Sequence, residues 1–178
     1  MAARRGDERA WIRGAQQGSV SDLEALFRHH WPKAYRAAYL VVHDSGAAED
    51  IAQEAFLAAV RGLDRFDRRR PFGPWLHRIV VNRAIDWSRA RALRRESGNA
   101  ALELVAAPAA PDNPHAQTLA AALAGLSPEH RAVIVLRHLL EYTPGEIAEV
   151  LGLPRGTVNS RLRRGLDELA ARFGEELE

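Results

Sequence analysis

The sequence predicts an all-α protein made of two small helical domains that are joined by a linker rich in proline and alanine. Apolar residues recur at intervals of three and four, and no segment alternates with the period of two that marks a β-strand. Pro108, Pro111 and Pro114 interrupt this pattern, because proline removes a helical hydrogen-bond donor and clashes with the preceding turn. We therefore expect an N-terminal domain over residues 8–97, a linker over 98–115 and a C-terminal domain over 116–174.

Three helices are expected in the N-terminal domain. The first begins at Ser21, which forms an S-x-x-E capping box with Glu24, and Pro32 is expected to kink it. The second covers about residues 47–63 and the third about 74–94. The side of the second helix that is expected to be buried carries Ile51, Ala52, Ala55, Phe56, Ala59 and Val60.

The opposite side of that second helix has a distinct composition. Its side chains follow one another at i, i+3, i+4, i+7 and i+11, and they are Asp50, Gln53, Glu54, Leu57 and Arg61. An exposed leucine among acidic and polar residues indicates a contact surface for another protein, although a single exposed leucine is also ordinary.

The C-terminal domain has the local signals of a helix-turn-helix. Ser127 is an expected N-cap followed by Pro128, the residue best tolerated at the first helical position. Thr143 and Glu146 form a second capping box, and Gly152 ends that short helix because glycine adopts the left-handed conformation freely. The pair Leu153-Pro154 turns the chain into another helix, which completes the motif.

The last helix carries the chemistry of a DNA reader. Residues 155–164 contain four arginines and no acid. At 100° per residue, one stripe faces the core with Val158, Leu162, Leu166 and Leu169. The rest of the surface presents Arg155, Thr157, Asn159, Ser160, Arg161, Arg163 and Arg164. Arginine reads guanine, asparagine reads adenine, and the second helix of this motif lies in the major groove, so we expect DNA binding rather than a merely solvated helix.

The distribution of charge indicates a second nucleic-acid contact. The net charge of the chain is only +2, yet residues 61–95 hold eleven arginines against three aspartates, a local charge of +8. A GC-rich genome accounts for the total number of arginines, but two separate positive clusters are typical of a nucleic-acid binder.

Several classes of protein are excluded or disfavoured. No apolar run approaches the roughly 18 residues of a membrane span, the N-terminus lacks the apolar region of a secretory signal, and there is no cysteine. The chain has no H-E-x-x-H pair, no G-x-S-x-G and no phosphate-binding glycine loop. We expect a cytoplasmic, soluble protein that is not an enzyme, inserts into no membrane and binds no metal or cofactor.

Three ordered stretches resemble the extracytoplasmic-function (ECF) sigma factors of bacterial RNA polymerase. They are "DIAQEAFLAAVRGLDRFD", "PFGPWLHRIVVNRAIDWSR" and "LSPEHRAVIVLRHLLEYTPGEIAEVLGLPRGTVNSRLRRGLDEL". The resemblance spans about residues 10–173. It implies that the first domain is similar to sigma region 2 and the second to the helix-turn-helix of sigma region 4.

The resemblance also implies partners and roles. Core polymerase would bind through its largest-subunit clamp helices and its flap region, and the chain would be released after initiation. The clamp helices would contact Asp50, Gln53, Glu54 and Leu57. The −10 element of promoter DNA would be opened by Arg65, Arg68, Arg69, Arg70, Phe72 and Asn82. Phe66 and Trp75 are further aromatic candidates, but packing in the core is favoured for Trp75.

Other implications concern promoter choice and regulation. The last helix would read the −35 element through residues 155–164, and Asn159 stands where many members have a basic residue. Asn82 and Asp86 match a W-L-x-x-I-x-x-N-x-x-x-D pattern, in which a structural hydrogen bond competes with a DNA contact. An anti-sigma factor is the regulator that the family implies.

Two alternatives to an initiation factor come from other classes. A stand-alone helix-turn-helix regulator would explain residues 127–172. It would leave unexplained the positive segment of residues 61–95, with its local charge of +8, and the face of Asp50, Gln53 and Glu54. An adaptor that binds only proteins would leave the arginine-rich last helix unexplained.

Overall fold

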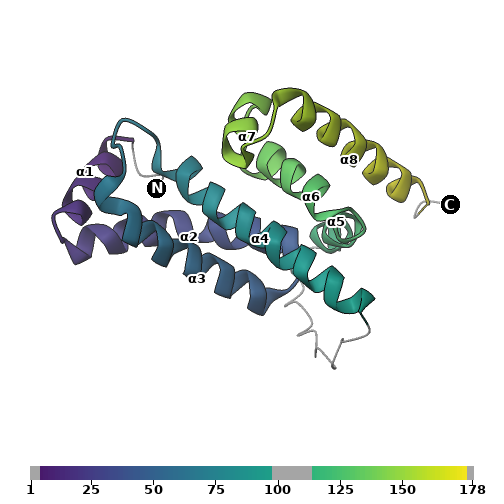
Figure 1. Ribbon diagram of the computed structural model, residues 1–178, viewed down its shortest axis with the longest axis horizontal. Coiled ribbons are helices and arrows are strands. Elements are labelled where there is room, and N and C mark those ends of the chain that lie inside the picture. The colour runs from purple at the N-terminus through teal and green to yellow at the C-terminus, as the bar shows by residue number, and fades with distance from the viewer. Residues whose placement is uncertain (1–4, 98–113, 176–178) are drawn as a thin grey trace.

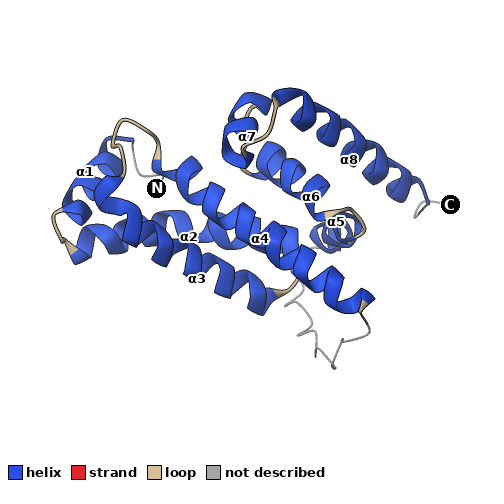
Figure 2. Cartoon of the chain, viewed as in Figure 1, coloured by secondary structure: helices blue, strands red, loops and turns tan. Residues whose placement is uncertain are grey.

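The computed structural model describes residues 5–97 and 114–175, which form helices and contain no β-strand (Figure 2). The all-α prediction is thereby confirmed. In chain order the elements are α1 (Arg5–Gln16), α2 (Val20–Val42), α3 (Ser45–Gly62), the 3₁₀ turn η1 (Leu63–Arg65), α4 (Phe72–Glu96), α5 (Pro114–Ala124), α6 (Pro128–Ile134), the π-helical turn η2 (Val135–Leu139), α7 (Pro144–Leu151) and α8 (Arg155–Glu175).

The helices form two bundles that lie against each other. Helices α1–α4 make an N-terminal bundle, and α5–α8 make a C-terminal bundle whose α6 and α7 lie along α4 (Figure 1). Helix α2 also contacts α5 and α6. The relative position of the two bundles therefore depends mainly on α4 and α2.

Helix α2 begins two residues earlier than the sequence predicts. Ser19, rather than Ser21, is the N-cap, and its hydroxyl accepts a hydrogen bond from the Asp22 backbone N–H. Gly18, at φ +86°, ends the preceding turn. The next residue, Ser19, has the extended conformation that an N-cap requires. The predicted capping box at Ser21 is wrong for this reason. Pro32 lies inside α2, which continues to Val42.

Small residues allow the N-terminal helices to approach closely. Helices α2, α3 and α4 contact one another, and the distance between packed helices depends on the side chains between them. The alanines buried in this core are Ala34, Ala37, Ala38, Ala48, Ala52, Ala55, Ala59 and Ala84. The frequent alanine of the sequence therefore has a structural use in this bundle.

Helix α4 is buried over an unusually wide arc, because one side packs on α2 and α3 while the other packs on α6 and α7. Its buried residues are Phe72, Gly73, Leu76, His77, Val80, Val81, Ala84, Ile85, Ser88 and Arg91. A helix at the surface of a single bundle would bury one stripe only. The presence of histidine, serine and arginine among the buried residues follows from this central position.

Most of the expected linker, residues 98–113, lies outside the described part of the chain. Its expected end differs slightly from the structure, because Pro114 and His115 already belong to α5. Proline is well suited to the first helical position, where its missing N–H has no helical partner to lose.

Capping in the C-terminal bundle follows the sequence. Ser127 is the N-cap of α6 and accepts a hydrogen bond from the His130 backbone N–H at 3.2 Å. The helix then widens into the π-helical turn η2, and Glu141 takes a left-handed φ of +60°. This turn redirects the chain toward α7.

The buried stripe of α8 differs from the prediction at one position. Val158 and Leu169 are buried and Leu162 packs partly against the core, but Leu166 is 43% exposed. Gly165 takes its place: a Cβ there would lie 2.9 Å from the Cδ1 atom of Ile134. The straight 3.6-residue repeat from Val158 passes through position 165 before 169, so Leu166 lies to the side of the stripe.

Candidate nucleic-acid interface

The turn between α7 and α8 has the geometry of a helix-turn-helix. The capping box of α7 is complete: Thr143 Oγ1 accepts from the Glu146 N–H at 3.3 Å, and Glu146 Oε2 accepts from the Thr143 N–H at 2.8 Å. The Thr143 backbone N–H and the Thr143 hydroxyl both donate to this carboxylate, and these two hydrogen bonds lower the pKa of Glu146. Gly152 ends α7 at φ +64°, as predicted, and the next residues lead directly into α8.

The first three turns of α8 present polar and cationic side chains outward. Arg155, Asn159, Arg163 and Arg164 are exposed, while Thr157, Ser160 and Arg161 are half-buried. The Ser160 hydroxyl donates a hydrogen bond to the Thr157 carbonyl oxygen at 3.0 Å. The structure thus brings the residues predicted for the −35 contact onto one end of one helix.

The arginine-rich loop between η1 and α4 is an ordered turn. The Asp67 carboxylate accepts from the Arg69 backbone N–H at 2.9 Å, and the Asp67 carbonyl oxygen accepts from the Arg70 N–H at 2.9 Å. Arg65, Arg68, Arg69 and Arg70 are all exposed. A short acidic residue therefore shapes the loop while the guanidinium groups project to solvent.

Gln16, which sequence reasoning missed, holds this loop from α1. Its side-chain amide donates to the Leu63 carbonyl oxygen at 2.8 Å and to the Phe66 carbonyl oxygen at 3.1 Å. The contacts join residues 47 and 50 positions apart in sequence. No local pattern marks such a pair, because a lone glutamine near a helix end is common.

We expect Gln16→Ala to weaken binding of a single-stranded −10 oligonucleotide by roughly tenfold, because two hydrogen bonds that order the loop are lost, each worth about 1 kcal/mol at most in this partly exposed setting. Fluorescence anisotropy measures the effect. Gln17→Ala is the matched control, since Gln17 is the exposed residue that directly follows the end of α1. Equal affinities of the two variants would remove Gln16 from this role.

An aromatic cluster lies behind the arginine loop. Phe72, predicted as a −10 contact, is only 3% exposed, and Phe66 is also buried. Their rings pack on each other and on Trp75, with centroids 4.7 to 5.7 Å apart. In this conformation Phe72 and Phe66 support the loop, and Trp75 is half-buried against the core. A stacking role for Phe72 would require the cluster to open.

Asn82 and Asp86 lie on α4, at the seam with the C-terminal bundle. Both line a cleft of about 400 Å³ together with Arg89, Glu129 and Arg161. Asp86 is exposed and lies 4.0 Å from Arg89 across an ion pair. The pattern that pairs these two residues therefore places them on a shared face that opens toward α8.

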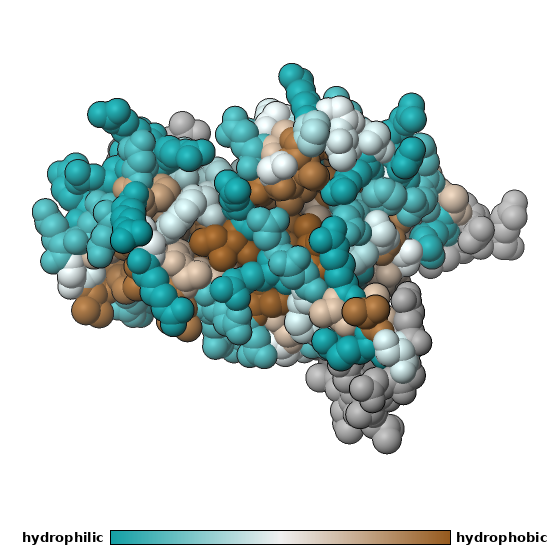
Figure 3. Space-filling model, viewed as in Figure 1, coloured by the Kyte–Doolittle hydropathy of each residue, from teal (hydrophilic) through white to brown (hydrophobic). Residues whose placement is uncertain are grey.

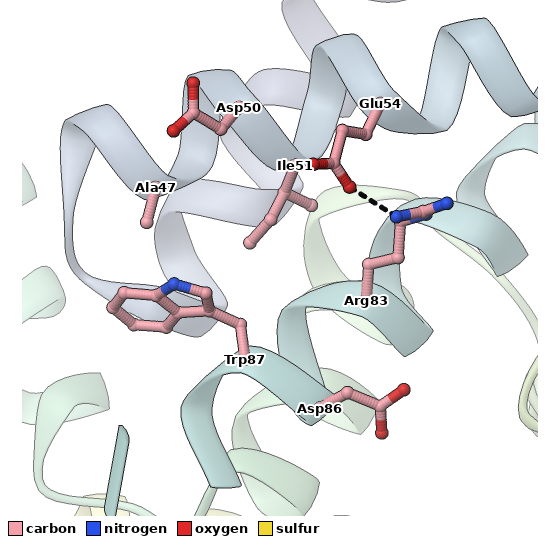
Figure 4. Close-up of a pocket in the computed structure, with 7 residues that line it drawn as sticks. All are labelled: Ala47, Asp50, Ile51, Glu54, Arg83, Asp86 and Trp87. Atoms are coloured by element: carbon pink, nitrogen blue, oxygen red, sulfur yellow. Dashed lines mark hydrogen bonds and ion pairs between the residues drawn. The ribbon is translucent and has the colours of Figure 1, made fainter. Parts of the chain in front are cut away.

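The polar face of α3 is exposed as predicted, and it joins α4 in a shallow pocket. Asp50 and Glu54 line this pocket with Arg83 and Trp87 (Figure 4). Glu54 accepts a hydrogen bond from Arg83 at 2.5 Å across the two helices. Because both side chains are largely exposed, we expect the pair to add little stability.

An apolar groove lies beside this face, between α2 and α3. It has a volume of about 430 Å³ and is lined by Val20, Leu23, Glu24, Phe27, Gln53, Phe56, Leu57 and Val60. Leu57 is 55% exposed, as its position predicts, whereas Val60 was expected in the core and is 41% exposed. The prediction for Val60 is wrong, because this side chain lines the groove between α2 and α3 instead of entering the core, and it adds to the exposed apolar surface there.

Within the described ranges, 5–97 and 114–175, no three His, Asp or Glu side chains are grouped closely enough to hold a metal ion. The helices described are each too short or too polar to cross a lipid bilayer.

The C-terminal bundle ends in a helix-turn-helix, and the N-terminal bundle combines an arginine loop with an exposed protein-contact face. Together these features define a DNA-binding transcription factor that engages a second protein. Comparison with known proteins specifies the class. The family described as Sigma-70 region 2 matches residues 26–94, and Sigma-70, region 4 matches residues 116–169.

Relatives match over nearly the whole chain. The ECF RNA polymerase sigma factor SigW of Bacillus subtilis (strain 168) is 31% identical over 89% of this chain and 90% of its own. The RNA polymerase sigma factor CarQ of Myxococcus xanthus is 32% identical over 92% and 96%. The solved structure of CnrH in complex with the cytosolic domain of CnrY has a TM-score of 0.71 at 29% identity, covering 95% of this chain and 98% of that one.

The chain belongs to the ECF sigma factor family. It is a promoter-directing transcription initiation factor that binds core RNA polymerase and promoter DNA, and its family consists of non-enzymatic transcription factors. The sigma factor RpoE of Bartonella quintana, in complex with the anti-sigma factor NepR, shares the fold, with a TM-score of 0.67 at 24% identity.

Proposed function

We propose that three separate surfaces of this chain divide the work of initiation. The exposed face of α3 docks on core polymerase, the arginine loop with α4 opens the −10 element, and the N-terminal half of α8 reads the −35 element. The observation that carries the proposal is the outward presentation of all three sets of polar residues from helices that are otherwise well packed.

The polymerase contact would consist of Asp50, Gln53, Glu54 and Leu57 and would include the adjoining apolar groove. Acidic residues beside exposed apolar ones suit a helical partner with basic and apolar side chains, and the resemblance points to the clamp helices of the largest subunit. The C-terminal bundle would contact the flap region.

The two DNA contacts would differ in the form of DNA that they bind, a single strand in one case and a duplex in the other. Arg65, Arg68, Arg69 and Arg70 would track phosphates of an opened strand, and Asn82 on α4 would approach its bases. The residues on α8, from Arg155 to Arg164, would enter the major groove of duplex DNA. Phe72 would serve the −10 contact through the buried cluster that supports the loop.

The remaining features of this proposal concern organisation and regulation. The N-terminal unit would be residues 8–97, the linker 98–115 and the C-terminal unit 116–174. The chain would act in the cytoplasm with the polymerase, would carry no catalytic activity itself and would be released after initiation. An anti-sigma factor would regulate it, as the complex of RpoE with NepR illustrates for that protein.

Run-off transcription with core polymerase and a library of promoters tests the proposed function. We expect transcripts from promoters that share two short elements, and sequencing of the active templates identifies both. A chain that binds duplex DNA but never supports a transcript would instead behave as a stand-alone helix-turn-helix regulator.

We expect the double substitution Gln53→Ala with Glu54→Ala to weaken binding to core polymerase by roughly 10- to 100-fold, or about 1.4–2.8 kcal/mol, because exposed polar residues at the centre of an interface act as anchors. Co-purification and surface plasmon resonance measure this. Arg83→Ala is the control, because it removes the Glu54–Arg83 pair while keeping Glu54. An equal loss in Arg83→Ala would assign the effect to α4.

A further inference from the structure

Helix α1 meets the arginine loop at both ends of the loop. Gln16 holds the beginning of the loop through its hydrogen bonds to the carbonyl oxygens of Leu63 and Phe66. The end of the loop, residues 69–71, lines a cleft of about 160 Å³ together with the first half of α1. Figure 3 shows hydrophilic side chains over the part of the molecule where Figure 1 places α1 and this loop.

The cleft between α1 and the loop is cationic. Its lining residues are Glu8, Arg9, Ile12, Arg69, Arg70 and Pro71. Three positive charges and one negative charge give it a local net charge of +2. The three arginines are exposed, and their guanidinium groups form no ion pair with any residue that the structure describes. Like charges that gather in one cleft repel each other, and a bound polyanion removes that cost.

The one acid of the cleft is bound to a neighbouring helix. The Glu8 carboxylate and Nε2 of His30 on α2 lie 2.7 Å apart in a hydrogen bond, and both side chains are largely buried. His30 also packs on the ring of Phe72 at the start of α4, with centroids 5.1 Å apart. Because Arg9 directly follows Glu8, these contacts also fix the position of Arg9 beside the loop.

The cations of the cleft continue those of the loop. Arg65 and Arg68 are exposed on the loop itself, and Arg9 adds a cation that lies outside the loop sequence. A series of separated guanidinium groups suits a partner with regularly spaced anions, and arginine binds phosphate through paired hydrogen bonds. A single nucleic-acid strand is a partner of this kind, and it is long enough to reach both elements.

We propose that Arg9 is a further strand-binding residue: together with Arg69 and Arg70 it holds one backbone phosphate of the opened −10 strand, so that the strand passes from the loop onto α1. This inference rests on the proposed function of the arginine loop. Phosphate contacts position a strand and carry no sequence information, so Arg9 contributes affinity and no base preference.

Binding to a strand of a single base type tests the role of Arg9. The probe is a fluorescein-labelled thymidine strand of about 20 nucleotides, since a phosphate contact needs no particular base. We expect Arg9→Ala to weaken binding by about fivefold and to make the slope of log affinity against log salt less steep by about 0.7, the value for one phosphate of a single strand. Fluorescence anisotropy over a range of salt concentrations measures both.

Two variants separate a phosphate contact from other roles of this position. Arg13→Ala is the matched control, because Arg13 is exposed one turn further along α1 and is not among the residues that line the cleft. We expect it to bind within about twofold of the parent. Arg9→Lys keeps the charge, so its salt slope should equal that of the parent. A loss in Arg9→Lys or in Arg13→Ala as large as that in Arg9→Ala would overturn the phosphate contact.

A double-mutant cycle tests whether α1 and the loop hold the same phosphate. The effect of Arg9→Ala is measured in the parent and in a loop variant, Arg69→Ala with Arg70→Ala. If the three arginines share one phosphate, the loss caused by Arg9→Ala should shrink from about fivefold to less than about twofold in the loop variant. An equal loss in both backgrounds would show that Arg9 acts independently, and the shared cleft would be refuted.

The outcomes separate this inference from the proposed function. Parent affinity in the loop variant would refute the strand contact of the arginine loop, on which both depend. A loss in the loop variant, combined with parent affinity in Arg9→Ala, would leave the proposed function in place and exclude Arg9 alone.

Discussion

Replacing Arg68, Arg69 and Arg70 together with alanine is expected to weaken binding to the opened strand of the −10 element by roughly 100-fold, since three charged contacts of about 1 kcal/mol each are removed. The salt dependence should change as well. For a single strand each phosphate contact contributes about −0.7 to the slope of log affinity against log salt, so the slope should become less steep by about 2. The probe is a single strand with the sequence of the non-template strand of a promoter that is active in run-off transcription. Its binding, measured between 50 and 200 mM salt, gives both the affinity and the slope.

The control must change the net charge equally. Arg28 and Arg36 on α2 and Arg13 on α1 are exposed and lie outside the loop sequence, and their replacement with alanine removes the same three charges. We expect this control to alter the slope by much less. Equal slopes for the two triple variants would show that the general field of the protein, rather than the loop, attracts the strand.

Replacing Leu169 with alanine is expected to lower the free energy of unfolding by about 2–5 kcal/mol, because this side chain is 7% exposed and its removal leaves a cavity in the C-terminal core. Leu166→Ala is the matched control. It changes the same residue type on the same helix, but Leu166 is 43% exposed, so we expect a change within about 0.5 kcal/mol. Urea denaturation followed by circular dichroism measures both.

The comparison of these two leucines decides between the sequence pattern and the structure. The pattern alone places Leu166 and Leu169 on one buried stripe, whereas the structure gives the place of Leu166 to Gly165, against Ile134. Equal destabilisation by the two substitutions would favour the sequence prediction. Loss at Leu169 alone would support the packing observed here.

Local features of the fold were predictable because their causes lie within a few residues. The capping box of Thr143 and Glu146, the N-cap at Ser127 and the left-handed Gly152 are all found where the pattern predicts them. Each depends on hydrogen bonds or backbone angles within one helical turn. The start of α2 was misplaced by two residues because two serines, Ser19 and Ser21, offer competing caps, and the preceding turn selects between them.

The sequence by itself determined an all-α chain of two helical units, a helix-turn-helix with a cationic second helix, and an exposed polar face on α3, because helical periodicity and capping are local properties. Only the tertiary structure decided that α4 is buried on both sides, that Gln16 holds the arginine loop, and that His77 meets Tyr142 across the seam. These contacts join residues tens of positions apart. They depend on how two amphipathic surfaces pack, and a helical pattern that shows which side is apolar does not show what will cover it.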